Sequence, residues 1–291
     1  MASGRGRSWP SPAMAGPSRF AHRWFAARQT GAVLGDGVEL PAGYVELQLR
    51  FARRSAALGT HDFADAMTQL TNLHRRLGFG DPSEPTDERW TRYLYGLDAH
   101  RHLGEQVRWT VAFAASNRAV PPPSSAVARA GPFSVHVHGD LLRTHFVPKA
   151  ADATSPLHAS RLLLRRSELR AALETASRLY PEAQRVRGAS WLYSTKSYCA
   201  LFPTTHIASA TERTGAYQFQ GSSAWGQFLD HRGGVKANLA ARFVAAVDNY
   251  DGDAPWTLFP IPTLIVDSPI EVFALGADVG AADDAVSETL P

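Results

Sequence analysis

The sequence predicts an α+β protein in which a helical part is followed by a mixed part of helices and strands. Three observations support this fold class. Apolar residues recur at helical spacing through residues 30–118, a proline-rich segment interrupts them at 119–131, and the alternation typical of a strand begins at Phe133. Three successive prolines cannot enter a helix or a central strand. We therefore expect 119–131 to be a stiff linker, with a second domain at 132–275.

Four helices are expected in the first part. Pro41 suits the first turn of a helix that ends near Leu58, and Asp62 can cap the next one. That second helix should carry an apolar stripe at spacings of three and four residues, formed by Phe63, Met67, Leu70, His74 and Leu77. Helical spacing returns at 90–97 and again at about 98–115. Together the four helices could pack as a small bundle.

The second part begins with an expected hairpin. Segments 133–138 and 141–147 alternate between apolar and polar residues, and Gly139-Asp140 supplies a two-residue turn. A helix capped by Ser167 and stopped by Pro181 should follow. We also expect a short helix at 235–247 and further strands at 189–193, 207–214, 217–220, 263–266 and 270–273.

Charge is divided unevenly along the chain. Residues 1–29 carry five Arg and no acid, and residues 243–291 carry nine acids and no Lys or Arg. We expect 1–29 to be a disordered basic leader and 276–291 a disordered acidic tail. The sequence pI of about 9.2 therefore reflects the leader, since the rest of the chain is close to neutral. The composition gives no support to a nucleic-acid partner.

Composition also bears on the compartment. With 44% hydrophobic and 20% charged residues, the chain is neither largely disordered nor collagen-like. A single cysteine, Cys199, cannot form an intrachain disulfide, so the fold does not depend on an oxidising compartment. No run approaches 18 apolar residues, and the leader lacks the apolar segment of a secretory signal. We expect a cytoplasmic protein without a membrane partner; the oligomeric state stays open.

The hairpin concentrates titratable side chains. If Gly139-Asp140 is the loop, His136 faces Arg143 and Ser134 faces His145, so His136, His138, Arg143 and His145 share one face. The other face should belong to the core. Three interpretations of the histidine face stay open: half-exposed sheet surface, the lining of a cleft, or a zinc or iron site. Arg143 would repel a metal ion there.

Residues 187–229 are the stretch richest in small polar and aromatic side chains. Such a mixture is typical either of a small-molecule pocket or of a packed sheet whose Trp and Tyr polar atoms find internal partners. Ser190 could act as a nucleophile only beside a base. Cys199 lies in a mostly apolar run and is expected to be buried.

Four short motifs follow one another in the second part: Phe133-Ser134-Val135-His136-Val137-His138, Ser190-Trp191-Leu192, Leu201-Phe202-Pro203 and Gln218-Phe219-Gln220. Their order after a helical part resembles that of bacterial two-domain proteins with a helical N-acyltransferase N-terminal domain and a GNAT-like C-terminal acyltransferase domain. The likeness covers about residues 60–275. It implies a GNAT-like α/β fold for 132–275 and acyl-CoA as the cofactor.

One stretch partly matches the pyrophosphate loop of that family, Gln/Arg-x-x-Gly-x-Gly/Ala. Residues 185–190 begin correctly with Arg185 and Gly188, but Ser190 stands where Gly or Ala is expected. The stretch also precedes an expected strand, whereas the loop should open a helix.

The leading hypothesis is a GNAT-like acyltransferase, or a degenerate relative, that acts on a small-molecule amine or thioester substrate. The catalytic candidates are His136 and His138 as the base, together with Ser190. The cofactor-binding candidates are Arg187, Gly188 and Gln220. One alternative is a non-catalytic module that binds a small molecule or a protein. The other is a metal-dependent enzyme that uses the hairpin histidines His136, His138 and His145.

Overall fold

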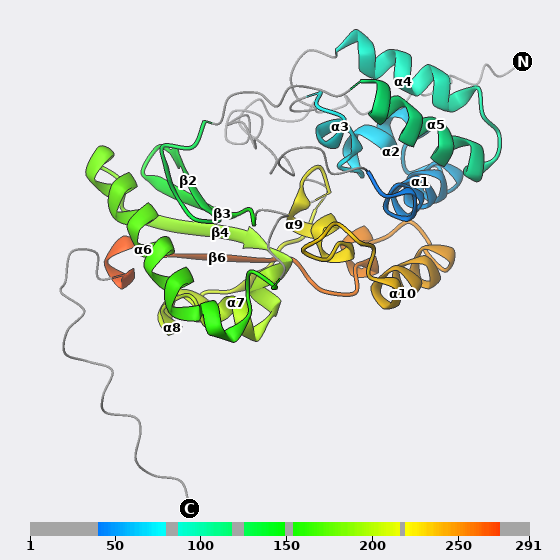
Figure 1. Cartoon of the computed structure of the whole chain (residues 1–291). Helices are drawn as coiled ribbons and strands as arrows, with labels where there is room; N and C mark the ends of the chain where they lie inside the picture. Colours follow the sequence, from blue (N-terminus) through cyan, green and yellow to red (C-terminus); the bar gives the residue numbers. More distant parts are fainter. Residues whose placement is uncertain (1–39, 80–86, 118–124, 149–153, 216–218, 274–291) are drawn as a thin grey trace, which may run out of the picture.

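The computed structural model describes residues 40–79, 87–117, 125–148, 154–215 and 219–273 (Figure 1). These residues form two hydrophobic cores. One core is helical, and the other lies between a sheet and its covering helices. The expected leader at 1–29, the tail at 276–291 and most of the proline-rich segment lie outside the described residues. Within the described residues, no helix is long and apolar enough to cross a membrane.

The first helices form close to where the sequence predicts them. They are α1 (Ala42–Ala57), α2 (Phe63–Gln69), α3 (Leu73–Arg76), α4 (Glu88–Asp98) and α5 (Leu103–Ser116). The Asp62 side chain caps α2, as expected, by accepting the Asp65 N–H. The stripe expected along one helix is instead shared by α2 and α3. The chain breaks between them because the Asn72 N–H donates to the Gln48 side chain of α1 rather than continuing the helix.

The helical core also contains a later part of the chain. Residues 219–261 supply α9 (Ser222–Trp225) and α10 (Ala237–Asp248), together with 3-10 turns at Gly226–Phe228 and Pro255–Leu258. Phe51 of α1 lies within ring contact of five aromatic residues from this segment: Phe219, Trp225, Phe243, Tyr250 and Phe259. Residues 132–275 therefore do not form a separate hydrophobic unit, because the aromatic residues of 219–261 complete the first core.

The second unit is built on a six-stranded sheet with the order β1-β2-β3-β4-β6-β5. Its strands are β1 (Ala128–Ala130), β2 (Phe133–His138), β3 (Leu141–Phe146), β4 (Arg185–Ser190), β5 (Thr211–Glu212) and β6 (Leu264–Pro269). Every neighbouring pair is antiparallel except β3 and β4, which are parallel and joined through α6 (Leu162–Leu179). Such a crossover is what a parallel pair requires.

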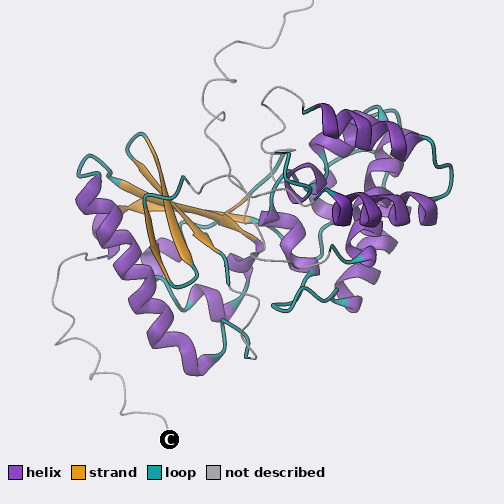
Figure 2. Cartoon of the chain, turned by 45° about the horizontal axis from the view of Figure 1, so that its top comes forward, coloured by secondary structure: helices purple, strands orange, loops and turns teal. Residues whose placement is uncertain are grey.

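The hairpin register is confirmed. His138 pairs with Leu141, His136 with Arg143 and Ser134 with His145. Both faces of the sheet follow from this register. One face packs against α6 (Figure 2) and is apolar, with four fully buried strand residues: Val135, Leu142, Val186 and Val266.

Other expectations in this unit were wrong in detail. β1 lies in the stretch expected to be linker, because its backbone pairs with β2. The strand expected at 189–193 ends at Ser190, whose hydroxyl caps a 3-10 turn, Trp191–Ser194, by accepting the Leu192 N–H. The segment 207–214 divides between α8 (Thr204–Ala208) and β5, and 270–273 is a 3-10 turn.

The helix expected to start at Ser167 begins earlier, at Leu162, after a 3-10 turn at Ala159–Arg161. Ser167 is not its cap, because its hydroxyl donates to the Leu164 carbonyl inside the helix. A short helix, α7 (Lys196–Cys199), follows the Trp191–Ser194 turn and contributes Tyr198 to the core.

Candidate functional site

The face of the sheet opposite α6 is the polar face, and it carries most of the candidate residues. Strand alternation and register assign to it Arg129, His136, His138, Arg143, His145, Arg185, Arg187 and Asp267. Among the six strands, Asp267 is the only acidic residue on this face. A surface so rich in cationic side chains favours anionic ligands.

The three histidines of the hairpin lie together, as expected. The rings of His136 and His145 contact each other edge to face, with centroids 4.8 Å apart, and His136 Nδ1 lies 3.1 Å from the Ser125 hydroxyl. Burial, as the largest cause, and the neighbouring His138 and Arg143 lower the pKa of His136 to about 4. Burial and Arg143 also lower the pKa values of His138 and His145. All three imidazoles are therefore neutral at pH 7.

Arginines surround these imidazoles. Arg143 and Arg187 are direct partners across the parallel β3–β4 pair. Burial, as the largest cause, and then the nearby charges of Arg213, Arg75 and Arg187 together lower the pKa of Arg143 to about 10. Arg75 belongs to α3 of the helical unit, whereas Arg213 follows β5. The polar face therefore meets the helical unit at a cluster of positive charge.

Arg213 is the most deeply buried of these cations. Its backbone N–H donates to the Thr263 carbonyl at 2.8 Å, which extends the β5–β6 pairing by one residue. The residue is 7% exposed, and burial lowers its pKa to about 10. Asp267 does not neutralise it, because that carboxylate already accepts from Arg185 at 3.0 Å and from Arg187 at 2.6 Å.

Ser190 does not join the histidines. Alternation along β4 turns it to the face opposite Arg187, and its hydroxyl is used as the cap of the following turn. His206, a potential base near it in sequence, is buried in the α/β core with Nδ1 2.7 Å from the Ser268 hydroxyl. The Ser190 hydroxyl contacts the Leu192 N–H and His206 contacts Ser268, so neither contact activates Ser190 as a nucleophile.

The three cofactor-binding candidates are also separated. Arg187 pairs with Asp267 on the polar face, and the Gln220 amide donates to the Gln69 side chain of α2 at 2.6 Å. Gly188 lies on the apolar face, where an added Cβ would meet the Tyr193 hydroxyl at 1.9 Å. The glycine is therefore explained by close packing against Tyr193.

The stretch that partly matches a pyrophosphate loop is not a loop. Residues Arg185–Ser190 form β4, and every one of them has a partner in β6. The backbone groups on that side are therefore used within the sheet. A phosphate-binding loop before a helix would have to be elsewhere in the chain.

The hairpin also lacks the geometry of a metal centre. Within the described ranges, no three His, Cys, Asp or Glu side chains are grouped so that they could hold a metal ion. Arg143 stands directly opposite His136 and repels a cation. These findings give the metal-dependent alternative no support.

The parallel β3–β4 pair is short. Register is kept for three residue pairs, which end at Arg143 and Arg187. Beyond that point the Thr144 hydroxyl reaches the Arg187 carbonyl only at 3.4 Å, and the Ser223 hydroxyl of α9 donates to the Ala189 carbonyl. The two central strands thus lose their pairing beside the histidines, where α9 of the helical unit contacts β4.

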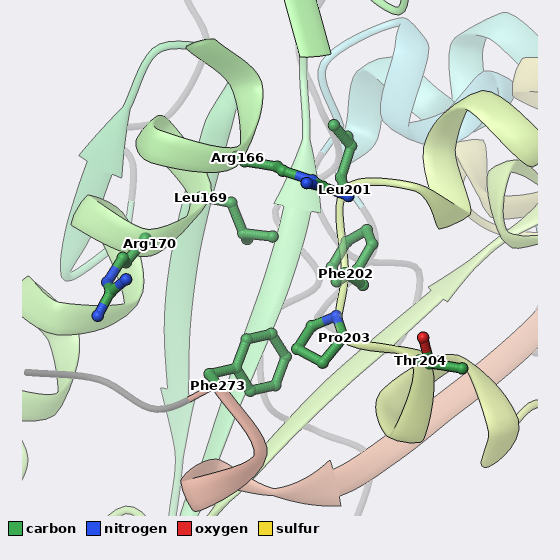
Figure 3. A pocket seen from close by; sticks show the side chains of 8 residues that line it. All are labelled: Arg166, Leu169, Arg170, Leu201, Phe202, Pro203, Thr204 and Phe273. Atoms are coloured by element: carbon green, nitrogen blue, oxygen red, sulfur yellow. The ribbon is translucent and has the colours of Figure 1, made fainter. Parts of the chain in front are cut away.

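Two cavities lie on the helix side of the sheet. The larger, about 310 Å³, is shown in Figure 3; apolar side chains of Leu169, Phe202 and Phe273 form its wall, and Arg166 and Arg170 stand at its margin. The second, about 250 Å³, lies where α6 begins and is bordered by His158, Arg165 and Lys196. Neither cavity includes a hairpin histidine.

Sequence reasoning did not find Arg75, Arg213 or Asp267. Each belongs to a segment far from the hairpin in sequence, and only the sheet order and the packing of α3 bring them to the polar face. The sequence offered one signal for Arg213: the strand-like alternation through residues 211–213, which places Thr211 and Arg213 on the same face. Cys199 is half-buried, and its thiol contacts the Tyr193 carbonyl at 3.0 Å.

Comparisons of the chain with models of known protein families, with curated proteins and with solved structures find no match.

Proposed function

We propose that the chain is a GNAT-like acyltransferase, or a degenerate relative, that transfers an acyl group from a thioester to a small-molecule amine on the polar face. The observation that carries this proposal is the loss of pairing between β3 and β4 directly beside the hairpin histidines. The order of motifs adds support. The strand with the His-x-His motif and the strand that ends at Ser190 belong to the same sheet, and the crossover helix α6 lies between them in the sequence.

Beyond Arg143 and Arg187 the facing edges of β3 and β4 are not paired with each other, and such edges suit an extended ligand that carries amide groups. Such a ligand can add to a strand through main-chain hydrogen bonds. Acyl-CoA has an arm of this kind between its thioester and its phosphates. On the apolar side the opening is closed by the buried Tyr193, so the thioester would meet the acceptor on the histidine side.

His138 is the best-placed base on this face. It is half-buried, whereas His136 is 6% exposed and already lies beside Ser125 and His145. In the proposed step the amine nitrogen attacks the thioester carbonyl and the C–S bond breaks. The thiolate leaves, and the amine proton passes to the neutral imidazole.

The test combines binding and turnover. Full-length protein is titrated with acyl-CoAs of increasing chain length in a thermal-shift assay, and free thiol release is then measured with a panel of amines. His138→Gln should lower turnover by about 100-fold or more and leave acyl-CoA stabilisation intact. His158→Gln, at the start of α6 and away from the polar face, is the matched control for loss of an imidazole.

Three outcomes separate the hypotheses. Stabilisation and turnover that depend on His138 support the enzyme. Stabilisation by acyl-CoA without turnover on any amine supports a degenerate relative that only binds. No stabilisation at any chain length contradicts the proposal.

A further inference from the structure

We propose that Arg213 and Arg143, with Arg75 of the helical unit, bind the oxyanion of a small-molecule ligand, a carboxylate or a phosphate. Combined with the proposed function, on which this part rests, the cluster would select acceptor amines that also carry an oxyanion. The binding of the anion itself does not depend on catalysis.

The first argument is the position of Arg213. The hydrogen bond from its N–H to Thr263 keeps it in strand register, and alternation from Thr211 turns its side chain to the polar face. The residue is 7% exposed, yet no described residue forms a hydrogen bond or ion pair with its guanidinium. A largely buried guanidinium without a partner is costly, because it loses much of its hydration.

The second argument is the concentration of positive charge around Arg213. Arg213, Arg75 and Arg187 all act electrostatically on Arg143, so these guanidiniums lie near one another. The only acidic residue that the strands supply to this face is bound by Arg185 and Arg187. The neighbouring histidines have lowered pKa values, so they are neutral and neither add to nor offset this positive charge. An incoming anion would reduce the repulsion at the whole cluster.

The third argument concerns the class of ligand. Guanidinium groups bind carboxylates and phosphates through two parallel hydrogen bonds. Here the cations come from three separate segments, α3, β3 and the end of β5; Arg213 is buried, and Arg75 and Arg143 are half-buried. Convergence from several elements suits a small oxyanion better than a long polyanion, which would need an exposed basic surface. His138 shares the face, so one ligand could place its oxyanion at the arginines and its amine at the imidazole.

The test measures anion binding without acyl-CoA. Full-length protein is titrated with inorganic phosphate, acetate and chloride at constant ionic strength, and the midpoint of thermal unfolding is followed. We expect phosphate or acetate, but not chloride, to raise the midpoint, as binding to the folded state requires. Arg213→Gln should weaken the apparent affinity at least 10-fold. Arg185→Gln, an exposed arginine on the same face, should leave it within about 2-fold.

A second variant tests whether Arg213 has only a structural role. Arg213→Met removes the buried charge but keeps apolar volume, so without anion it should be at least as stable as the wild type. A lower midpoint with an unchanged anion response would overturn the proposal. So would equal responses of the wild type and Arg213→Gln, or equal effects of chloride and the oxyanions.

The anion-binding and acyl-CoA experiments also distinguish failure of the oxyanion site from failure of the proposed acyltransferase activity. Anion binding that depends on Arg213, found without any response to acyl-CoA, would retain the oxyanion site and reject the acyltransferase. If Arg213→Gln lowered turnover of neutral and anionic amines by the same factor, the oxyanion site would be rejected and the acyltransferase activity retained. Greater stabilisation by phosphate than by acetate would identify the oxyanion as a phosphate, and the reverse as a carboxylate.

Discussion

The two faces of the six-stranded sheet come from the same strands, and they affect stability in opposite ways. Val135, Leu142 and Val186 are fully buried against α6, and apolar burial stabilises the fold by about 25 cal/mol per Å². On the other face Arg213 is buried and Arg143 is half-buried, and burial disfavours their charged forms. The apolar face therefore stabilises the sheet, whereas the polar face keeps charged groups at a cost in stability.

The largest difference should appear between neighbouring leucines of β3. Leu142 is fully buried on the apolar face, and Leu141 is partly exposed on the polar face. Leu142→Ala should lower the free energy of unfolding by about 2–5 kcal/mol, because it removes buried contacts and leaves a cavity. Leu141→Ala should cost less than about half as much. Denaturant unfolding measures both, and equal losses would contradict the assignment of the faces.

Acid should destabilise the apolar side through His206. This imidazole is fully buried between Phe202 and Phe273, and burial lowers its pKa to about 4, against about 6.5 when unfolded. Above pH 6.5 both states are neutral and the full stability is present. As the pH falls towards 4 the unfolded state takes up the proton first, so about 3 kcal/mol is lost.

His206→Phe removes this titration and should make the loss of stability between pH 6.5 and 4 shallower. The slope should fall by up to about 1.4 kcal/mol per pH unit in denaturant unfolding measured across that range. His61→Phe, at a partly exposed position, serves as the control. An unchanged slope would mean that His206 is not the group that resists protonation.

Gly188→Ala tests whether the glycine of β4 serves packing or a cofactor. An added Cβ would lie 1.9 Å from the Tyr193 hydroxyl, so the variant should lose about 1–3 kcal/mol through overpacking. The control is Gly104→Ala in α5, where the nearest atom is 3.7 Å away and alanine favours the helix. If Gly188→Ala kept its stability but lost the response to acyl-CoA, the cofactor interpretation would be restored.

Local patterns predicted the parts of this fold that depend on local chemistry. The Gly139-Asp140 turn predicted the hairpin register, and this register places His136, Arg143 and His145 on the same face of the sheet. Helices with clear spacing, such as α4, were also found. The start of α6 was not, because Leu162 follows a 3-10 turn that has no helix-capping pattern in the sequence.

The long-range features could not be predicted in this way. Alternation and capping say nothing about which core a segment joins, so the return of residues 219–261 to α1 was missed. Ser190 looked like a site residue, but its hydroxyl is a cap. The arginine cluster depends on the sheet order, which puts β5 and β6 beyond β4, and on the placement of α3.

The smallest effect should come from the exposed ion pair at the margin of the polar face. Arg185 is half-exposed, and Asp267, its partner at 2.9 Å, keeps a second ion pair with Arg187 when Arg185 is lost. Arg185→Gln should therefore cost less than about 1 kcal/mol, since exposed pairs are screened by water and salt. Asp267→Asn should cost more, because it leaves two arginines without their carboxylate. Denaturant unfolding of both variants at low and high salt ranks them, and the reverse order would show that Asp267 does not hold the polar face together.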